Sequence, residues 1–340
     1  MVSNQNLSSL GGMGRCWVGY VKFCLAGPAI VTDLLAGEMD MSHRFRKPQL
    51  LDFFIILVLS VIWGSAFGAI KIAVDGTAPF TVVAARTIIG GIGVCVWLMV
   101  NGSWRLNWQG LPWGRLCSIA FLGTLLPFFL ISWAEQYVDS SVAGLLNGTG
   151  PLVTVLGAHF ITRDELLTKG RMAGVIIGMG GVAILMYDGL SQLGGASLIA
   201  QLALMLAFSC YAGGNLMVRG VHGITPVQLT GFSLILSSFL ALPLAFFLEQ
   251  PEPMTWSADI WASLLWLGLI STAFAFTLRY VLINRAGAGF LSNVGYTIPM
   301  VAVVIGVVLL GEAVTLPKLL ALLVILASLY ITRRAGVKLR

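Results

Sequence analysis

Charged side chains are scarce in this sequence, because lysine, arginine, aspartate and glutamate together make up only 10% of its 340 residues. Soluble globular domains carry roughly 25% charged residues. The apolar fraction of 58% and the mean hydropathy of +0.92 point the same way. This composition excludes an ordinary soluble domain and predicts a membrane protein that crosses the bilayer many times.

Histidine and cysteine are also rare, with three and five copies. The cysteines are scattered and show neither pairing nor metal-ligand spacing, and we interpret His159 as a packed residue. No Ser-His-Asp set, HExxH motif or glycine-rich phosphate loop occurs. We therefore expect no catalytic residue, metal or cofactor, although an intramembrane lipid-handling enzyme or a membrane scaffold remains an alternative.

Long apolar runs, by contrast, fill the chain. A membrane-spanning helix needs about 20 mostly apolar residues, and ten runs approach or exceed this length, with short loops between them. They cover about 52–74, 79–100, 115–134, 139–162, 171–187, 195–219, 226–248, 259–282, 287–311 and 316–332. The expected fold class is an all-α polytopic membrane protein with ten transmembrane helices.

The two halves of the chain share a constant offset. A shift of 148 residues lays Leu122–Pro151 over Ile270–Pro299 without a gap and pairs the two prolines. We infer two copies of one unit, at about 52–187 and 195–334. Five spans per copy is an odd number, so the second copy enters the membrane from the opposite side, which is a common design of secondary transporters.

The basic residues report orientation. With both termini in the cytoplasm, the predicted inner ends and loops hold nearly all lysines and arginines after residue 43, and Lys318 alone lies outside. The net charge of +6 therefore does not indicate a nucleic-acid partner. We divide the chain into a cytoplasmic leader, two repeats and a basic cytoplasmic tail, at residues 1–50, 51–190, 191–334 and 335–340.

Residues 1–40 fit poorly with the rest of the leader. The short apolar run between residues 23 and 31 cannot span a bilayer and contains Gly27 and Pro28. We interpret residues 1–40 as an over-long start assignment, with translation beginning at Met41. The alternative is a short interfacial helix.

Polar residues and prolines interrupt several spans. Lys71 and Arg86 are the two cations that we expect inside the membrane, where a charge normally faces protein or water. Pro151 and Pro299 each lie about 12 residues into a span, near the membrane midplane. A helical proline removes one hydrogen bond, so we expect Pro151 to free the carbonyl of Asn147 and to help form a cavity.

Four short motifs stand in a fixed order along the chain: Trp63-Gly-Ser-Ala-Phe-Gly-Ala-Ile-Lys71, Pro79-Phe-Thr followed by Arg86, the Asn147-to-Pro151 turn, and Gly311-Glu312 before the last span. In this order and spacing they resemble the EamA-type members of the drug/metabolite transporter superfamily, over about residues 50–335. The resemblance implies ten helices around a central cavity, with the fifth and tenth spans outside, and alternating access.

The resemblance also implies a site and a function. The cavity candidates carried over from it are Trp63, Asn147, Thr149, Tyr211, Asn215, Thr272, Asn293 and Tyr296. Tyr211 departs from the family pattern, in which tryptophan is frequent. Many members export amino acids or related metabolites across the bacterial inner membrane, and we expect the same here, from a monomer or a homodimer. A multidrug exporter of the same fold is the alternative.

The distribution of acidic residues narrows the expected substrate. From residue 52 onward, every aspartate and glutamate lies at a predicted span end or in a loop. A cationic drug would therefore meet no compensating charge in the cavity, and an unpaired buried ion is costly. We expect transport of neutral to anionic small metabolites with tolerance of apolar and aromatic side chains, either by facilitated exchange or by coupling that uses no buried carboxylate.

Overall fold

The computed structural model describes residues 48–102, 110–153, 156, 168–191, 196–218, 221–252, 255–291 and 293–337. Every regular element in this part of the chain is a helix. The all-α class predicted from the sequence is therefore confirmed. Residues 1–40, His159, and most basic residues between 103 and 167 lie outside the described ranges.

The helices follow the predicted runs closely in position. The longer ones are α2 (Leu50–Gly76), α3 (Pro79–Val100), α8 (Lys169–Ser191), α9 (Ala196–Val218), α10 (Pro226–Leu244), α14 (Val294–Leu310) and α15 (Leu316–Val337). Two further spans are composite, α4–η1–α5 (Trp113–Ala120, Phe121–Leu125, Leu126–Ala134) and α11–η4–α12 (Ala258–Leu265, Trp266–Phe274, Ala275–Ala286). The short helices α6 (Ser140–Leu146) and α13 (Ala288–Leu291) precede the two proline-bearing regions.

Seven helical segments of the described chain are long and apolar enough to cross a membrane, and Val294–Leu310 and Leu316–Thr332 are shorter apolar helices. Large apolar side chains on their outer surfaces are exposed, for example Phe239 at 76% and Phe247 at 75%. Such an apolar exterior would be unfavourable in water and suits contact with lipid. The chain is a multi-pass membrane protein.

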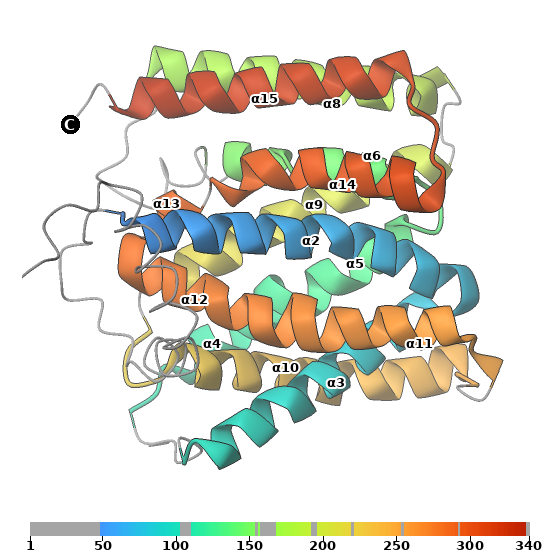
Figure 1. Cartoon of the computed structure of the whole chain (residues 1–340), viewed down its shortest axis with the longest axis vertical. Helices are drawn as coiled ribbons and strands as arrows, with labels where there is room; N and C mark the ends of the chain where they lie inside the picture. Colours follow the sequence, from blue (N-terminus) through green and yellow to red (C-terminus); the bar gives the residue numbers. More distant parts are fainter. Residues whose placement is uncertain are drawn as a thin grey trace, which may run out of the picture.

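The helices form layers (Figure 1). The pair α8 and α15 lies side by side at the top of the view, next to α14 and α6. Below them, α2, α9, α5 and α12 form the middle of the bundle, and α10 packs against α3 at the bottom. Glycines permit the close contact of the top pair, because a Cβ at Gly174 would lie 2.0 Å from Thr332 Oγ1.

π-helical turns occur at equivalent places in the two halves. Adding 148 to the bounds of η1, 121–125, gives 269–273, which falls inside η4 (Trp266–Phe274). Such turns widen the helix by one residue and are frequent at functional sites. The structure thus repeats a local distortion at the same offset that relates the two halves of the sequence.

Two glutamates join the halves at one end of the bundle, which we call the outer end because the predicted topology places it outside the cell. Glu249, the last residue of η2 (Ala245–Glu249), which continues α10, accepts hydrogen bonds from the backbone of Phe80 and Thr81 at 2.8 and 2.7 Å, at the start of α3. Glu312, after α14, accepts bonds from the backbone of Ser140 and Ser141 at 2.7 and 3.0 Å, at the start of α6. Each carboxylate caps a helix of the other half, where the helix dipole favours a negative charge.

We expect Glu249→Ala and Glu312→Ala each to destabilise the protein by about 1–2 kcal/mol, because each leaves two helix N-terminal amides without their acceptor. Thermal unfolding of the purified protein in detergent measures the effect. Glu252→Ala is the matched control, because the Glu252 side chain is exposed. The hydroxyl of Thr255 bonds the backbone carbonyl of Glu252, which the substitution keeps. An equal loss in the control would contradict the capping role.

Candidate substrate cavity

A cavity of about 160 Å³ lies between the two halves. Its walls come from α2, α3, α5, α9, α12, α13, α14, the π-helical η4 and the Asn147–Pro151 turn. Among the described residues that line it, none belongs to α8, α10 or α15. The arrangement matches the expectation of a central cavity with the fifth and tenth apolar runs at the periphery.

Two buried arginines line the cavity, and each is only 3% exposed. Arg86 on α3 donates from Nε and Nη2 to the Thr272 hydroxyl, at 3.3 and 3.0 Å, and its guanidinium lies 3.6 Å from the centroid of the Phe128 ring. The Nε and Nη2 groups of Arg279 on α12 have no hydrogen-bond partner among the described residues. Buried donors are normally paired, so Arg279 has unused capacity to bind an anion.

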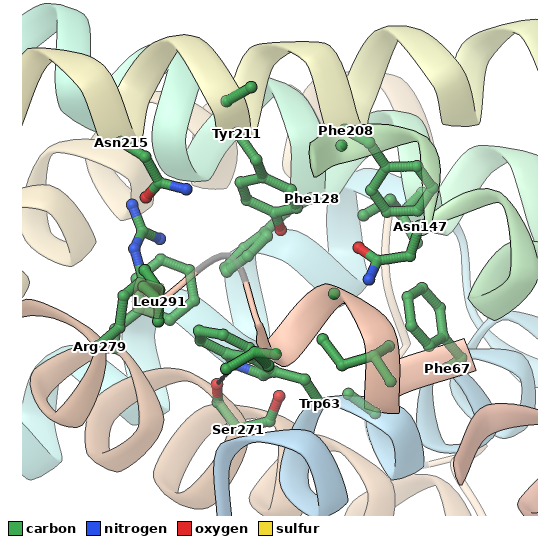
Figure 2. A pocket seen from close by; sticks show the side chains of 18 of the residues that line it. Trp63, Phe67, Phe128, Asn147, Phe208, Tyr211, Asn215, Ser271, Arg279 and Leu291 are labelled. Atoms are coloured by element: carbon green, nitrogen blue, oxygen red, sulfur yellow. Dashed lines mark hydrogen bonds between the residues drawn. The ribbon is translucent and has the colours of Figure 1, made fainter. Parts of the chain in front are cut away.

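Aromatic rings form much of the remaining wall (Figure 2). Trp63 on α2 donates from Nε1 to the carbonyl of Ser271 at 3.2 Å and packs edge-on against Phe276, with 6.1 Å between the ring centroids. Tyr211 on α9 faces the same space. The cavity therefore combines apolar surface with two cations, which suits a substrate that has an apolar body and an anionic group.

Unpartnered acceptors lie beside the arginines. The Oδ1 atom of Asn215 and the Oγ atom of Ser271 have no hydrogen-bond partner among the described residues, and both residues line the cavity. In Figure 2 the side chains of Asn215 and Arg279 point into the same end of the cavity. This end therefore offers both free donors and a free acceptor to a ligand.

The proline-bearing segments of the two halves cross next to the cavity. A Cβ added to Gly295 would lie 2.5 Å from Cγ of Pro151, so only glycine permits this approach. The expectation of a free Asn147 carbonyl is wrong, because the amide of Gly150 donates to it at 3.1 Å. The chain tightens into a shorter turn before Pro151, which satisfies the carbonyl that the proline leaves.

The structure brings about half of the predicted residues to the cavity. Those that line it are Trp63, Arg86, Asn147, Pro151, Tyr211 and Asn215. They come from α2, α3, the Asn147–Pro151 turn and α9, which are far apart in the sequence. The aromatic residues Phe67 and Phe276 also line it.

The remaining predicted residues have other contacts. Thr149 donates its hydroxyl to the carbonyl of Leu146 at 2.7 Å, and Asn293 donates from Nδ2 to the carbonyl of Phe290 at 2.7 Å. The Tyr296 hydroxyl bonds the carbonyl of Leu329 on α15 at 2.8 Å, away from the cavity. Thr272 does not line the cavity, but its hydroxyl accepts a hydrogen bond from Arg86, which does. Pro299 lies inside α14 and does not line the cavity either.

Lys71 also lies off the cavity. Its Nζ donates to the backbone carbonyl of Glu135 at 2.7 Å and lies 3.7 Å from Asp75. The expectation that Lys71 and Arg86 are the two intramembrane charges is incomplete. Arg279, which the sequence analysis places among the cytoplasmic loops and span ends, is buried inside α12, and Glu135 is 0% exposed directly after α5.

The helical spacing of residues in the sequence does indicate Arg279. Arg279 follows Thr272 by seven residues, two helical turns, and Phe276 by three, so all three share a helical face. Phe128 and Phe208 were not predicted, because a phenylalanine within an apolar run does not show whether it packs against other helices or lines a cavity. Ser271 enters the site through its position in η4, and no sequence motif marks it.

Comparison with known proteins places these features in a family. The sequence profile of the EamA-like transporter family matches twice, at residues 51–187 and 198–334. The two matched ranges coincide closely with the two units inferred from the offset of 148. A solved structure described as "Crystal structure of protein" aligns with a TM-score of 0.63 and 20% identity, over 86% of this chain and 100% of that chain, which supports the same fold.

Curated relatives carry transporter names. An uncharacterized transporter of Archaeoglobus fulgidus is 26% identical over 83% of this chain and 98% of its own length. The uncharacterized inner membrane transporter YedA of Escherichia coli K12 is 28% identical over 83% and 90%. A probable terminal-alkyne amino-acid exporter of Streptantibioticus cattleyicolor is 26% identical over 75% of this chain and 84% of its length.

Proposed function

Since this chain belongs to the EamA-like transporter family, we propose that it exports small carboxylate-bearing metabolites, most of all amino acids with apolar or aromatic side chains. The observation that carries the proposal is Arg279, a buried guanidinium on the cavity wall with Nε and Nη2 unpartnered among the described residues. A guanidinium binds a carboxylate through two parallel N–H groups. The substrate carboxylate therefore binds at Arg279.

The neighbouring groups suit the rest of an amino acid. The unpartnered Oδ1 of Asn215 is an acceptor for the substrate ammonium group. The rings of Trp63, Phe128 and Tyr211 provide an apolar surface for its side chain. The relative from Streptantibioticus cattleyicolor, named a probable amino-acid exporter, supports the same substrate class.

A multidrug exporter of cations is the second candidate, and the charges of the cavity disfavour it. Among the described residues of the cavity wall, the two that carry a formal charge, Arg86 and Arg279, are both cations. A lipophilic cation would be repelled by both in a low-dielectric space, where such repulsion is strong. Relatives named as transporters also favour transport over an intramembrane enzyme or a scaffold.

The transport cycle that we propose is alternating access of ten spans arranged as two inverted repeats, with both termini in the cytoplasm of a bacterial inner membrane. The two profile matches and the repeated π-helical turns support two equivalent units. The excess of basic residues at the predicted inner loops supports the orientation. Substrate moves through the cavity between the repeats while the peripheral pair α8 and α15 stays outside the path.

Counterflow in proteoliposomes tests the proposal directly. Vesicles preloaded with unlabelled substrate should accumulate labelled phenylalanine or leucine, and should not accumulate ethidium-like cations or nucleosides. Adding a proton gradient should not convert the protein into a cation exporter. Robust cation efflux without any amino-acid counterflow would refute the proposed substrate class.

A further inference from the structure

Glu135 is a buried acid that the proposed substrate site does not use. It is the first residue after α5, and its side chain is 0% exposed. Neither carboxyl oxygen has a hydrogen-bond partner among the described residues. Ile131, one helical turn before it, lines the cavity, so Glu135 lies directly beyond the outer part of the cavity wall.

The nearest cation does not neutralise this carboxyl group by direct contact. Lys71 donates its Nζ to the backbone carbonyl of Glu135 instead, and it pairs with the exposed Asp75 at 3.7 Å. The other charged groups that act on Glu135 are Arg86 on α3 and Glu312 after α14. Two of these four neighbours, Asp75 and Glu312, are anions, which disfavour a third negative charge in the same region.

An ionised carboxylate without hydrogen bonds is strongly unfavourable away from water, whereas a protonated acid carries no charge to desolvate. Burial therefore raises the pKa of the Glu135 carboxyl well above its usual range, and Lys71 only partly opposes this effect. A movement that hydrates the outer end would return the pKa toward its ordinary value near 4.3. The two conformations would then differ in their affinity for a proton.

We propose that Glu135 is a proton-binding site, and that proton binding stabilises the conformation in which this residue is sealed from solvent at the outer end. The inference rests on the alternating-access part of the proposed function and not on the identity of the substrate. It replaces the expectation that no buried carboxylate takes part. That expectation rested on the position of each acidic residue relative to the spans. Glu135 follows a span directly, but neighbouring helices cover its side chain on every side.

The direction of the pH effect follows from the two affinities. The sealed conformation holds the proton more tightly, so low pH favours it. As pH rises from the ordinary carboxyl pKa through the raised one, the proton no longer stabilises the sealed conformation, and the population of the open conformation increases. Each pKa unit of difference between the conformations changes their ratio by about tenfold over that range.

External cysteine labelling tests the site without any substrate. In a background from which the five native cysteines are removed, a single cysteine replaces Ile70, which lines the outer part of the cavity and is 3% exposed. A membrane-impermeant methanethiosulfonate is added from outside to cells at pH 5.5 to 8. A cysteine in place of the exposed Glu252 gives the reference rate at each pH and so corrects for thiol ionisation.

We expect the corrected labelling rate at position 70 to rise on the order of tenfold or more across this pH range. Glu135→Gln, an uncharged mimic of the protonated acid, should make the rate low and independent of pH. Asp75→Asn, which removes an exposed carboxylate near the same lysine, should keep the rise. The proposal would be overturned if the labelling rate rose equally in the Glu135→Gln protein. It would also be overturned if the rate did not change with pH in the single-cysteine protein that keeps Glu135.

A spectroscopic measurement covers the case in which Glu135→Gln fails to accumulate. Infrared spectra of the wild-type protein at neutral pH should contain the carbonyl stretch of a buried protonated carboxyl group. Glu135→Asp should shift this band, because the acid remains but its surroundings change. A spectrum without such a band, or a band unaffected by Glu135→Asp, would overturn the assignment. Normal amino-acid counterflow in either outcome would leave the proposed substrate class intact.

Discussion

Replacing Arg279 with methionine should weaken the binding of amino-acid substrates by about 10- to 100-fold, because a charged hydrogen bond contributes about 1.5–3 kcal/mol. Methionine keeps an unbranched apolar stem of similar length and removes only the guanidinium. The measurement is the concentration of unlabelled phenylalanine that halves the counterflow of labelled phenylalanine. Phenylalaninamide, which lacks the carboxylate, should compete poorly with labelled phenylalanine for the wild-type protein.

Two variants make this test specific. Arg279→Lys keeps the positive charge but loses the two-pronged geometry, so its affinity should fall between those of the wild-type protein and Arg279→Met. Arg334→Met removes an exposed arginine from the last turn of α15 and should leave the affinity unchanged. If Arg279→Met binds phenylalanine like the wild-type protein, the carboxylate does not bind at Arg279.

Replacing Gly295 with leucine should abolish transport and lower the thermal stability. Even a Cβ at this position would lie 2.5 Å from Cγ of Pro151, well inside van der Waals contact. The proline ring cannot rotate away, so the two crossing segments must separate. Overpacking of this kind costs about 1–3 kcal/mol. The leucine also projects toward the cavity that Gly295 and Pro151 line together.

Gly213 provides the matched control for this substitution. It lies in α9, another helix that lines the cavity, but a Cβ there meets no atom within 4 Å. Gly213→Leu should therefore keep both the melting temperature and the counterflow rate close to those of the wild-type protein. Equal damage from both substitutions would show that helix propensity, and not the Pro151 contact, sets the effect.

The sequence predicted the helical architecture well because hydrophobic length alone decides which segments can cross a bilayer. The run predicted at 79–100 is α3 with the same bounds, and the run at 226–248 ends one residue before the end of η2 at Glu249. The equivalence of the two halves was visible as an offset that does not depend on strong identity. Seven long spans and two shorter apolar helices are described, and the count of ten stays a prediction.

The residues of the site were predicted less well than the helices, because the packing of the helices decides which side chains reach the cavity. Helical periodicity states which residues share a face, but it does not state which face meets the cavity. Trp63 and Tyr211 face the cavity, whereas Tyr296 turns toward α15 and bonds the carbonyl of Leu329. The Thr149 hydroxyl donates to the carbonyl of Leu146, the last residue of α6, because a buried hydroxyl group commonly bonds a backbone carbonyl three or four residues earlier.

By itself, the sequence determined that this protein is a helical membrane protein built from two related units, because composition, run length and a constant offset need no knowledge of contacts. The tertiary structure alone decided which charges are buried. Arg279 and Glu135 sit near the ends of apolar runs, where a charge normally reaches water, and neighbouring helices cover both. Burial depends on what packs around a residue, and therefore on parts of the chain far away in sequence.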